Sequence, residues 1–200
     1  MPFKWEEKQA RYRDTSTGKF VKAETVTKLS TASIQATGDV AGGLAEKYTN
    51  KELRGREFKT IMRDEIKREV IRQYVLGRGG LERMDAKGWG QTGATIADQY
   101  KYLDGFVDEL KNLSQEQIAA RAKMYINSAR EGYEKGRAAA VKASGAFTEE
   151  HWVVDASKEN CSGCLELQAK GWVKLGELGQ FPGDGQTECK TSCLCGIEYR

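Results

Sequence analysis

The chain has 200 residues, of which 30% are charged and 39% are hydrophobic, and its formal net charge is +3. It contains no apolar run of about 18 residues, which excludes an ordinary transmembrane helix. A net charge this small does not by itself indicate a nucleic-acid-binding protein, although a modest basic bias lies on the first 150 residues. The length suffices for one substantial domain with a small module, or for two small domains.

The N-terminal residues predict little regular structure. From Arg11 to Val21, two short alternating segments flank a polar, glycine-containing turn, which predicts a short β-hairpin or an ordered arm. Residues 23–37 are rich in Ala, Thr and Ser and predict a weak helix that Gly38, with Gly42 and Gly43, should break. We therefore assign residues 1–48 to an N-terminal arm with a hairpin and a weak helix.

The strongest helical pattern covers residues 49–76. Thr49 and Glu52 fit a capping box, and apolar side chains recur every four positions between residues 58 and 74. The glycine-rich stretch at residues 77–80 follows this helix, whereas a phosphate-binding loop precedes the helix that holds the anion. We therefore interpret these glycines as the end of the helix and a turn.

Two further helices are predicted, one from Thr92 to Leu110 and one from Gln115 to Ala143, the latter opened by a Ser114–Gln117 capping box. The inner face of the last helix carries small residues and tyrosines, which favours close helix packing over a ligand site. We interpret Trp89, between the first two of these three helices, as a plug over the bundle, with an exposed partner contact as the alternative. Residues 49–145 thus predict a helical domain of about three long helices.

Residues 146–200 predict a small β-rich module, with short strands at residues 151–155 and 171–175 and a last strand in residues 193–199. The expected fold class is therefore mainly α, with a short N-terminal hairpin or arm and a small stapled module at the C-terminus. A module of about fifty residues with so few apolar side chains needs an additional source of stability, which a bound metal ion would provide.

All five cysteines lie in this module, in the pattern C-x2-C followed by C-x3-C-x-C, which is typical of a tetrahedral structural zinc site. Four of the five thiolates would close the coordination sphere of Zn2+ and leave no open position for catalysis. The fourth ligand is open, because two cysteines two residues apart on a strand point to the same face, and Cys193 is slightly favoured over Cys195. The candidate ligands are Cys161, Cys164, Cys189, Cys193 and Cys195.

Other interpretations of the cysteines remain open. A disulfide framework fits poorly, because the number of cysteines is odd and residues 1–6 lack the apolar stretch of an export signal. A redox-active Cys161-x-x-Cys164 would open a helix in a thioredoxin-like strand and helix pattern, which we do not expect here. The cysteines could also simply be buried. His151, the only histidine, is a further potential ligand that we interpret as a surface or packing residue.

The order of motifs after residue 150 resembles the C-terminal module of tailed-phage minor head proteins, the head-morphogenesis or Mu F-like family. The residues that carry the resemblance are Trp152-Val153-Val154, Cys161 and Cys164, Gly171-Trp172, Phe181-Pro182-Gly183-Asp184-Gly185, Cys189, Cys193-Leu194-Cys195 and Ile197-Glu198-Tyr199. Over residues 50–145 the resemblance is only architectural. The chain departs from the family at Cys189, close to where a histidine is usual, and at Leu194, where an arginine is usual.

The resemblance implies a virion structural or assembly protein that acts near the portal in head morphogenesis or in genome packaging and delivery. The implied partners are the portal, major capsid or scaffolding protein, with several copies in a particle, weak and non-specific contact with genomic DNA, and no membrane. The implied location is the virion head, and the host cytoplasm during assembly.

No recognisable catalytic motif accompanies the cysteines, so we do not expect an enzyme. Two rival functions stay open. The first is a zinc-ribbon protein that binds nucleic acid through a basic helix face. Its candidate phosphate contacts are Arg54, Arg56, Lys59, Arg63, Lys67 and Arg68. The second is a thiol oxidoreductase that uses Cys161.

Overall fold

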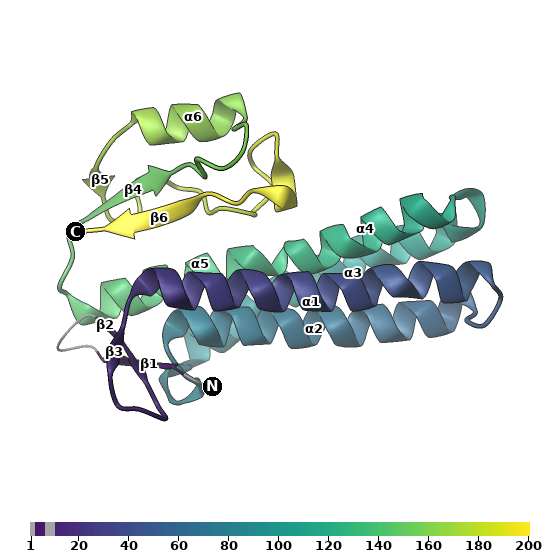
Figure 1. Ribbon diagram of the computed structural model, residues 1–200, viewed down its shortest axis with the longest axis horizontal. Coiled ribbons are helices and arrows are strands. Elements are labelled where there is room, and N and C mark those ends of the chain that lie inside the picture. Colours follow the sequence, from purple (N-terminus) through teal and green to yellow (C-terminus); the bar gives the residue numbers. More distant parts are fainter. Residues whose placement is uncertain (1–2, 7–10) are drawn as a thin grey trace.

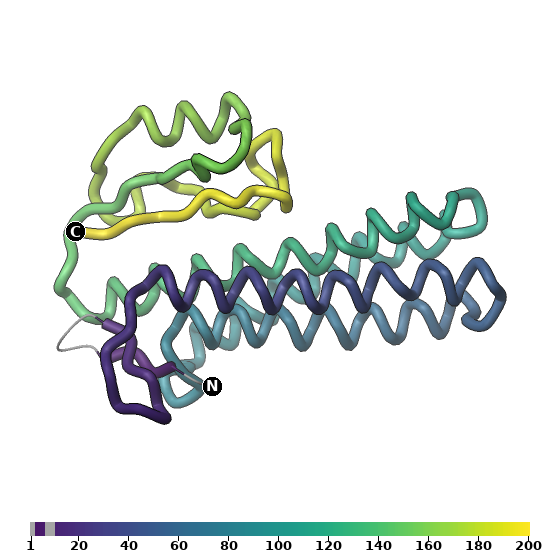
Figure 2. The backbone as a smooth tube through the Cα atoms, in the orientation of Figure 1, coloured from purple at the N-terminus to yellow at the C-terminus, as the bar shows by residue number. Residues whose placement is uncertain are grey.

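The computed structural model describes residues 3–6 and 11–200, and these are mainly helical with two small antiparallel sheets (Figure 1). Helices α1 (Ala23–Thr49), α2 (Gly55–Arg78), α3 (Ala86–Glu109), α4 (Gln115–Asn127) and α5 (Ala129–Ser144) form an elongated bundle whose path is followed most easily in Figure 2. The C-terminal module lies along one side of this bundle (Figure 1). Within residues 3–6 and 11–200, no helix combines the length and the apolar character needed to cross a bilayer.

The predicted hairpin is confirmed and is part of a larger sheet. Strands β2 (Arg11–Asp14) and β3 (Phe20–Val21) pair antiparallel, and β1 (Phe3–Glu6), which the sequence did not indicate, pairs with β2. The Tyr12 hydroxyl donates to the carbonyl oxygen of Gly77 at 2.8 Å, so this sheet is fastened to the end of α2. Residues 1–2 and 7–10 of the predicted arm lie outside the described residues.

Helix α1 contradicts the expectation of a weak helix broken at Gly38. It runs without interruption from Ala23 to Thr49, through all three glycines. Each glycine lowers helix stability by about 1 kcal/mol relative to alanine, but packing against neighbouring helices routinely overrides such a propensity. Here Ile34, Leu44 and other side chains of α1 are buried in the main core, and Gly42 lies against the Lys123 side chain of α4. Residues 23–49 therefore pack inside the bundle.

A buried polar network, which was not predicted from the sequence, joins α1 to α2. The Glu69 carboxylate is fully buried and accepts hydrogen bonds from Ser33 and Thr37 of α1, each at 2.9 Å. Arg72 and Gln73 of α2 donate to the same carboxylate at 2.7 and 2.6 Å. Because a buried charge is costly unless it is paired and hydrogen-bonded, these contacts explain how the bundle tolerates this carboxylate.

The predicted start of α2 was wrong, whereas the interpretation of the glycines at residues 77–80 as the end of the helix is confirmed, two residues later than predicted. Thr49 is the last residue of α1 rather than a cap, and the N–H of Arg54 donates to Glu57 at the true start. At the other end the helix continues to Arg78, and Gly79, with a left-handed φ of 90°, follows it. Gly77 lies inside the helix, and α5 passes so close to it that no side chain fits at this position. A Cβ there would lie 2.1 Å from the carbonyl oxygen of Tyr133.

Helix α3 begins six residues before the predicted Thr92, because Asp85 caps it by accepting from the N–H of Gly88 at 2.7 Å. Trp89 consequently lies in the first turn of this helix and is 44% exposed. Our interpretation of Trp89 as a plug over the bundle was therefore wrong.

The predicted helix from Gln115 to Ala143 is divided into α4 and α5 at Ser128. The Ser128 hydroxyl donates to the carbonyl oxygen of Tyr125 at 2.7 Å and thus competes with regular helical bonding at the junction. The capping box at Ser114 is confirmed. The interpretation of the small residues as a packing seam is supported by Gly136 of α5, which crosses α2 so closely that a Cβ would lie 2.4 Å from the carbonyl oxygen of Tyr74.

The C-terminal module is a three-stranded antiparallel sheet covered by one short helix. Strand β4 (Glu149–Val153) lies between β5 (Val173–Lys174) and β6 (Gly196–Tyr199), and α6 (Ser162–Ala169) connects β4 to β5. The strands fall where the sequence predicted them, with shifted or shorter bounds. The module has its own small core around Trp152, Leu167 and Ile197, which also includes the cysteines.

Candidate metal centre

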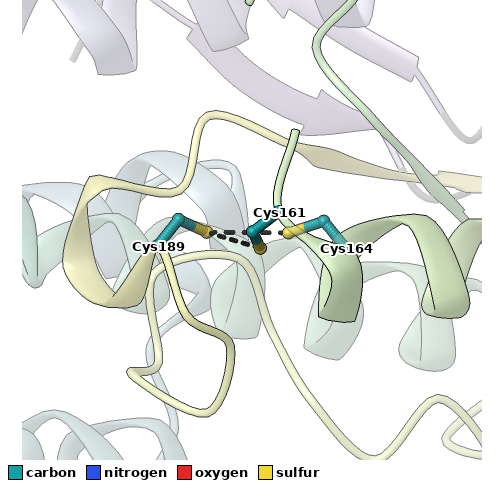
Figure 3. A group of neighbouring side chains, drawn as sticks. All are labelled: Cys161, Cys164 and Cys189. Atoms are coloured by element: carbon teal, nitrogen blue, oxygen red, sulfur yellow. Dashed lines mark hydrogen bonds between the residues drawn. The ribbon is translucent and has the colours of Figure 1, made fainter. Parts of the chain in front are cut away.

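Two segments of the module bring the five cysteines together. Cys161 immediately precedes α6 and Cys164 lies in its first turn. Cys189 comes just before the 3-10 turn Lys190–Ser192, whereas Cys193 and Cys195 lie between this turn and β6. Figure 3 shows the side chains of Cys161, Cys164 and Cys189 converging from the two segments. The predicted grouping of the thiols is therefore present in the structure.

The sulfur atoms form two groups that share Cys164. The Sγ atom of Cys189 lies 3.6 Å from the Sγ atoms of both Cys161 and Cys164. The second group contains Cys164, Cys193 and Cys195, and within each group every sulfur lies within 4.8 Å of the others. All five cysteines line one small cavity of about 50 Å³.

Three of the sulfur–sulfur distances match the spacing of a tetrahedral thiolate site. With zinc–sulfur bonds of about 2.3 Å, the sulfur atoms of a tetrahedron are about 3.8 Å apart. The separation between Cys164 and Cys193 is 3.7 Å, and the separations to Cys189 are nearly the same. The cluster could thus hold a metal ion, and its all-sulfur donor set suits a thiophilic metal such as zinc.

The structure gives a reason to keep Cys193 as the favoured fourth ligand. Its sulfur lies at nearly the tetrahedral spacing from Cys164, whereas the Cys195 thiol donates to Asn160 Oδ1 at 3.8 Å. Asn160 is itself fixed, because its amide donates to the carbonyl oxygens of Asp155 and Lys158 at 2.9 and 3.0 Å. Cys195 therefore has a protein partner of its own.

Glu188 links the two halves of the site, and the sequence analysis missed it. Its carboxylate accepts from the Ser162 hydroxyl at 2.6 Å and from the N–H of Gly163 at 3.1 Å, at the beginning of α6. These hydrogen bonds lower the pKa of Glu188 to about 2, and the one from Ser162 has the largest effect. The only sequence signal was its position next to Cys189. Glu188 positions the two cysteine-bearing segments relative to each other.

The thiols perturb one another's pKa values. A hydrogen bond from Cys193 lowers the pKa of Cys195 although burial acts in the opposite direction, and the same interaction raises the pKa of Cys193. Burial raises the pKa of Cys164. The pKa of Cys161 is lowered, because the backbone N–H groups of Cys164 and Cys189 outweigh the effect of burial. A metal ion would replace the shared protons in such a cluster.

One expectation about Cys161 and Cys164 was wrong, because this C-x-x-C motif does open a helix. Hydrogen bonding of the intervening residues to Glu188 stabilises the first turn of α6, which composition did not reveal. The surrounding sheet is antiparallel in the order β5-β4-β6, unlike the parallel strand–helix–strand unit typical of thioredoxin-like proteins.

The other candidate residues lie outside the cluster. A ring nitrogen of His151 is 3.2 Å from the carbonyl oxygen of Gln168, and the ring packs against Trp172, in agreement with a packing role. Of the six basic residues proposed to contact phosphate, three form ion pairs on the surface of the bundle. Lys59 and Arg63 share Asp104, which reduces the positive field available to a nucleic acid.

Comparisons of the chain with protein-family models, with curated proteins and with solved structures found no match. The resemblance to phage minor head proteins therefore depends mainly on the quoted motifs of residues 150–200.

Proposed function

We propose that the cysteine cluster holds one structural zinc ion, and that the chain is a non-catalytic structural protein. The observation that carries this proposal is the meeting of two cysteine-bearing segments at sulfur separations of 3.6 to 3.7 Å around a cavity of about 50 Å³. Bound zinc would supply folding free energy, which amounts to about 10–16 kcal/mol in small zinc-binding peptides. Cys161, Cys164, Cys189 and Cys193 would hold it.

Zinc content tests the metal part of the proposal directly. Protein purified under reducing conditions should contain one zinc ion per chain by elemental analysis. Replacement of Cys164, which both sulfur groups share, should abolish this zinc. Ser157→Ala is a matched control, since Ser157 lies in the same module and its hydroxyl donates to the carboxylate of Asp155. A metal-free protein whose module is nevertheless folded would contradict the proposal.

We further propose that the chain acts in tailed-phage head assembly, near the portal. The support is the order of Trp, Cys, Gly and Pro motifs in the module, together with an elongated helical bundle and a separate stapled end. In such a role the bundle and the module offer surfaces for the portal, major capsid or scaffolding protein, and catalysis is not required.

Co-purification distinguishes this role from nucleic-acid binding. The chain should retain a portal or capsid subunit after nuclease treatment, and its affinity for DNA should be weak at moderate salt. Tight DNA binding with a steep salt dependence, and no retained subunit, would instead support the nucleic-acid rival.

A thiol oxidoreductase is the second candidate, and one observation favours it. Cys161 occupies the N-cap position of α6, and its pKa is lowered through backbone N–H groups, as in reactive cysteines at helix N-termini. This function predicts turnover of a disulfide substrate by the zinc-free protein that disappears in Cys161→Ser and persists in Cys195→Ser. Absence of turnover in the wild type would exclude it.

A further inference from the structure

The module is attached to the bundle through a buried arginine. Arg130 of α5 is only 5% exposed, and its guanidinium donates to the carbonyl oxygens of Leu194 and Cys195 at 3.2 and 2.8 Å. A third hydrogen bond, at 3.3 Å, connects it to the Thr31 hydroxyl of α1. One side chain thus ties two helices of the bundle to the backbone of the module.

The two acceptors of Arg130 belong to the loop that supplies the second group of thiols. Leu194 lies between Cys193 and Cys195, so the orientation of its carbonyl group depends on the direction in which the neighbouring sulfur atoms are held. A metal ion bound by Cys193 would fix that sulfur atom in one place, next to Leu194. Without it, the three-residue loop between the 3-10 turn and β6 would be free to rotate its peptide groups away from Arg130.

Loss of these acceptors would be unfavourable for a docked module. A buried guanidinium whose N–H groups lack partners carries a large desolvation penalty, and Arg130 Nε is already buried without a partner. The alternative is for the module to separate and let water reach the arginine. The surface around Arg130 is closely packed, because a Cβ on Gly183 would lie 3.3 Å from the Cβ of Arg130, and so it leaves little room for adjustment.

We propose that metal binding at the cysteine cluster controls the docking of the C-terminal module on the helical bundle, with Arg130 as the positioning residue. This inference rests on the proposed metal site. Coupling between two binding events is reciprocal, so the docked bundle must strengthen metal binding by the same factor by which the metal strengthens docking. Undocking would expose the faces of α1, α4 and α5 that surround Arg130, and metal loading would cover them.

The first experiment uses the unmodified chain, with and without metal, in the presence of a reductant. Zinc content is measured in each sample, and urea unfolding is followed by circular dichroism at 222 nm, which reports mainly on the bundle. Removal of zinc by a chelator should lower the urea midpoint of the bundle as well as unfold the module. An unchanged bundle midpoint, with metal loss verified, would overturn the coupling while leaving the metal site intact.

The second experiment separates docking from folding of the module. Arg130→Met retains the apolar stem but removes the donors, and Arg68→Met is the control, because the exposed Arg68 forms an ion pair with Glu65 within α2. Zinc-loaded Arg130→Met should have a larger radius of gyration by X-ray scattering than the zinc-loaded wild type. It should also bind zinc at least about tenfold more weakly in competition with a chromophoric chelator, which corresponds to about 1.4 kcal/mol.

The outcomes distinguish the two proposals. A wild type that binds no zinc would contradict the metal site itself. A zinc-loaded Arg130→Met that is as compact as the wild type and binds zinc equally well would overturn the docking role of Arg130. The control Arg68→Met should resemble the wild type in both measurements.

Discussion

The close crossing of α2 and α5 makes a quantitative prediction about Gly136. A Cβ added at this position would lie 2.4 Å from the carbonyl oxygen of Tyr74 and 2.8 Å from the backbone nitrogen of Arg78. Both atoms belong to the backbone of α2, so neither can move as the end of a flexible side chain would. Ordinary carbon contacts are about 3.5 Å, and Gly136→Ala must therefore push the helices apart locally by about 1 Å.

The expected cost follows from two opposing effects. Forced overpacking in a well-packed core typically costs about 1–3 kcal/mol. Replacing glycine by alanine inside a helix returns about 1 kcal/mol. Because the clash involves two backbones and the helices pack along much of their length, we expect an overpacking cost near the upper end of this range. The net loss of stability is then about 1–2 kcal/mol.

Gly93 in α3 provides the matched control, since a Cβ there meets no atom within 4 Å. Gly93→Ala should stabilise the protein by about 0.5–1 kcal/mol through helix propensity alone. Urea unfolding of zinc-loaded proteins, followed at 222 nm, measures both changes. If Gly136→Ala were as stable as the wild type while Gly93→Ala gained the expected amount, the crossing would not be as close as the structure places it.

Three further predictions concern the metal centre and one helix cap. Cys193→Ser should weaken zinc binding more than Cys195→Ser, because the Cys195 thiol has a protein partner of its own; equal losses in a chelator competition would contradict this ligand set. Cys164→Ser should disorder the module but leave most helical circular dichroism at 222 nm, and a uniform loss of helicity would instead indicate one cooperative unit. The pKa of Asp85 is lowered in the folded protein, mainly by the hydrogen bond from the N–H of Gly88. The stabilisation by the Asp85 carboxylate is therefore complete above its ordinary pKa of 3.8 and is lost as the pH falls through the lower pKa of the folded state. Urea midpoints of the wild type and Asp85→Ala should accordingly differ at pH 7 and converge in acid.

The sequence was most informative where a local pattern alone decides the structure. The hairpin around Gly18 and the capping box at Ser114 follow from residues close together in the chain, and the grouping of the cysteines follows from their residue type and spacing. The mainly helical class was equally accessible, because the apolar residues of α2 repeat with helical spacing. In each case the responsible interactions span only a few residues or use an unusual residue type.

The errors occurred where tertiary contacts overrule a local preference. Gly42 and Gly77 look like helix breakers in sequence, but each lies against a neighbouring helix, where the small side chain allows close approach. Thr49 has the sequence of a cap, yet its hydroxyl donates to the carbonyl oxygen of Ala45 within α1. Such choices depend on partners that are distant in the chain, and a single sequence does not reveal them.

The candidate site likewise contains residues that the sequence reveals and residues whose roles depend on the folded structure. The thiols were visible because cysteine is rare in this chain and its spacing is characteristic, whereas Glu188 and Arg130 belong to abundant residue types and act through backbone groups. Their roles depend on the folded geometry: Glu188 joins the two cysteine-bearing segments, and Arg130 connects one of them to the bundle. A metal ion in this cluster would consequently be linked, through one loop and one guanidinium, to helices that contribute no ligand. If the proposed coupling holds, the module is a part of the bundle whose attachment depends on metal and not an independent domain at its end.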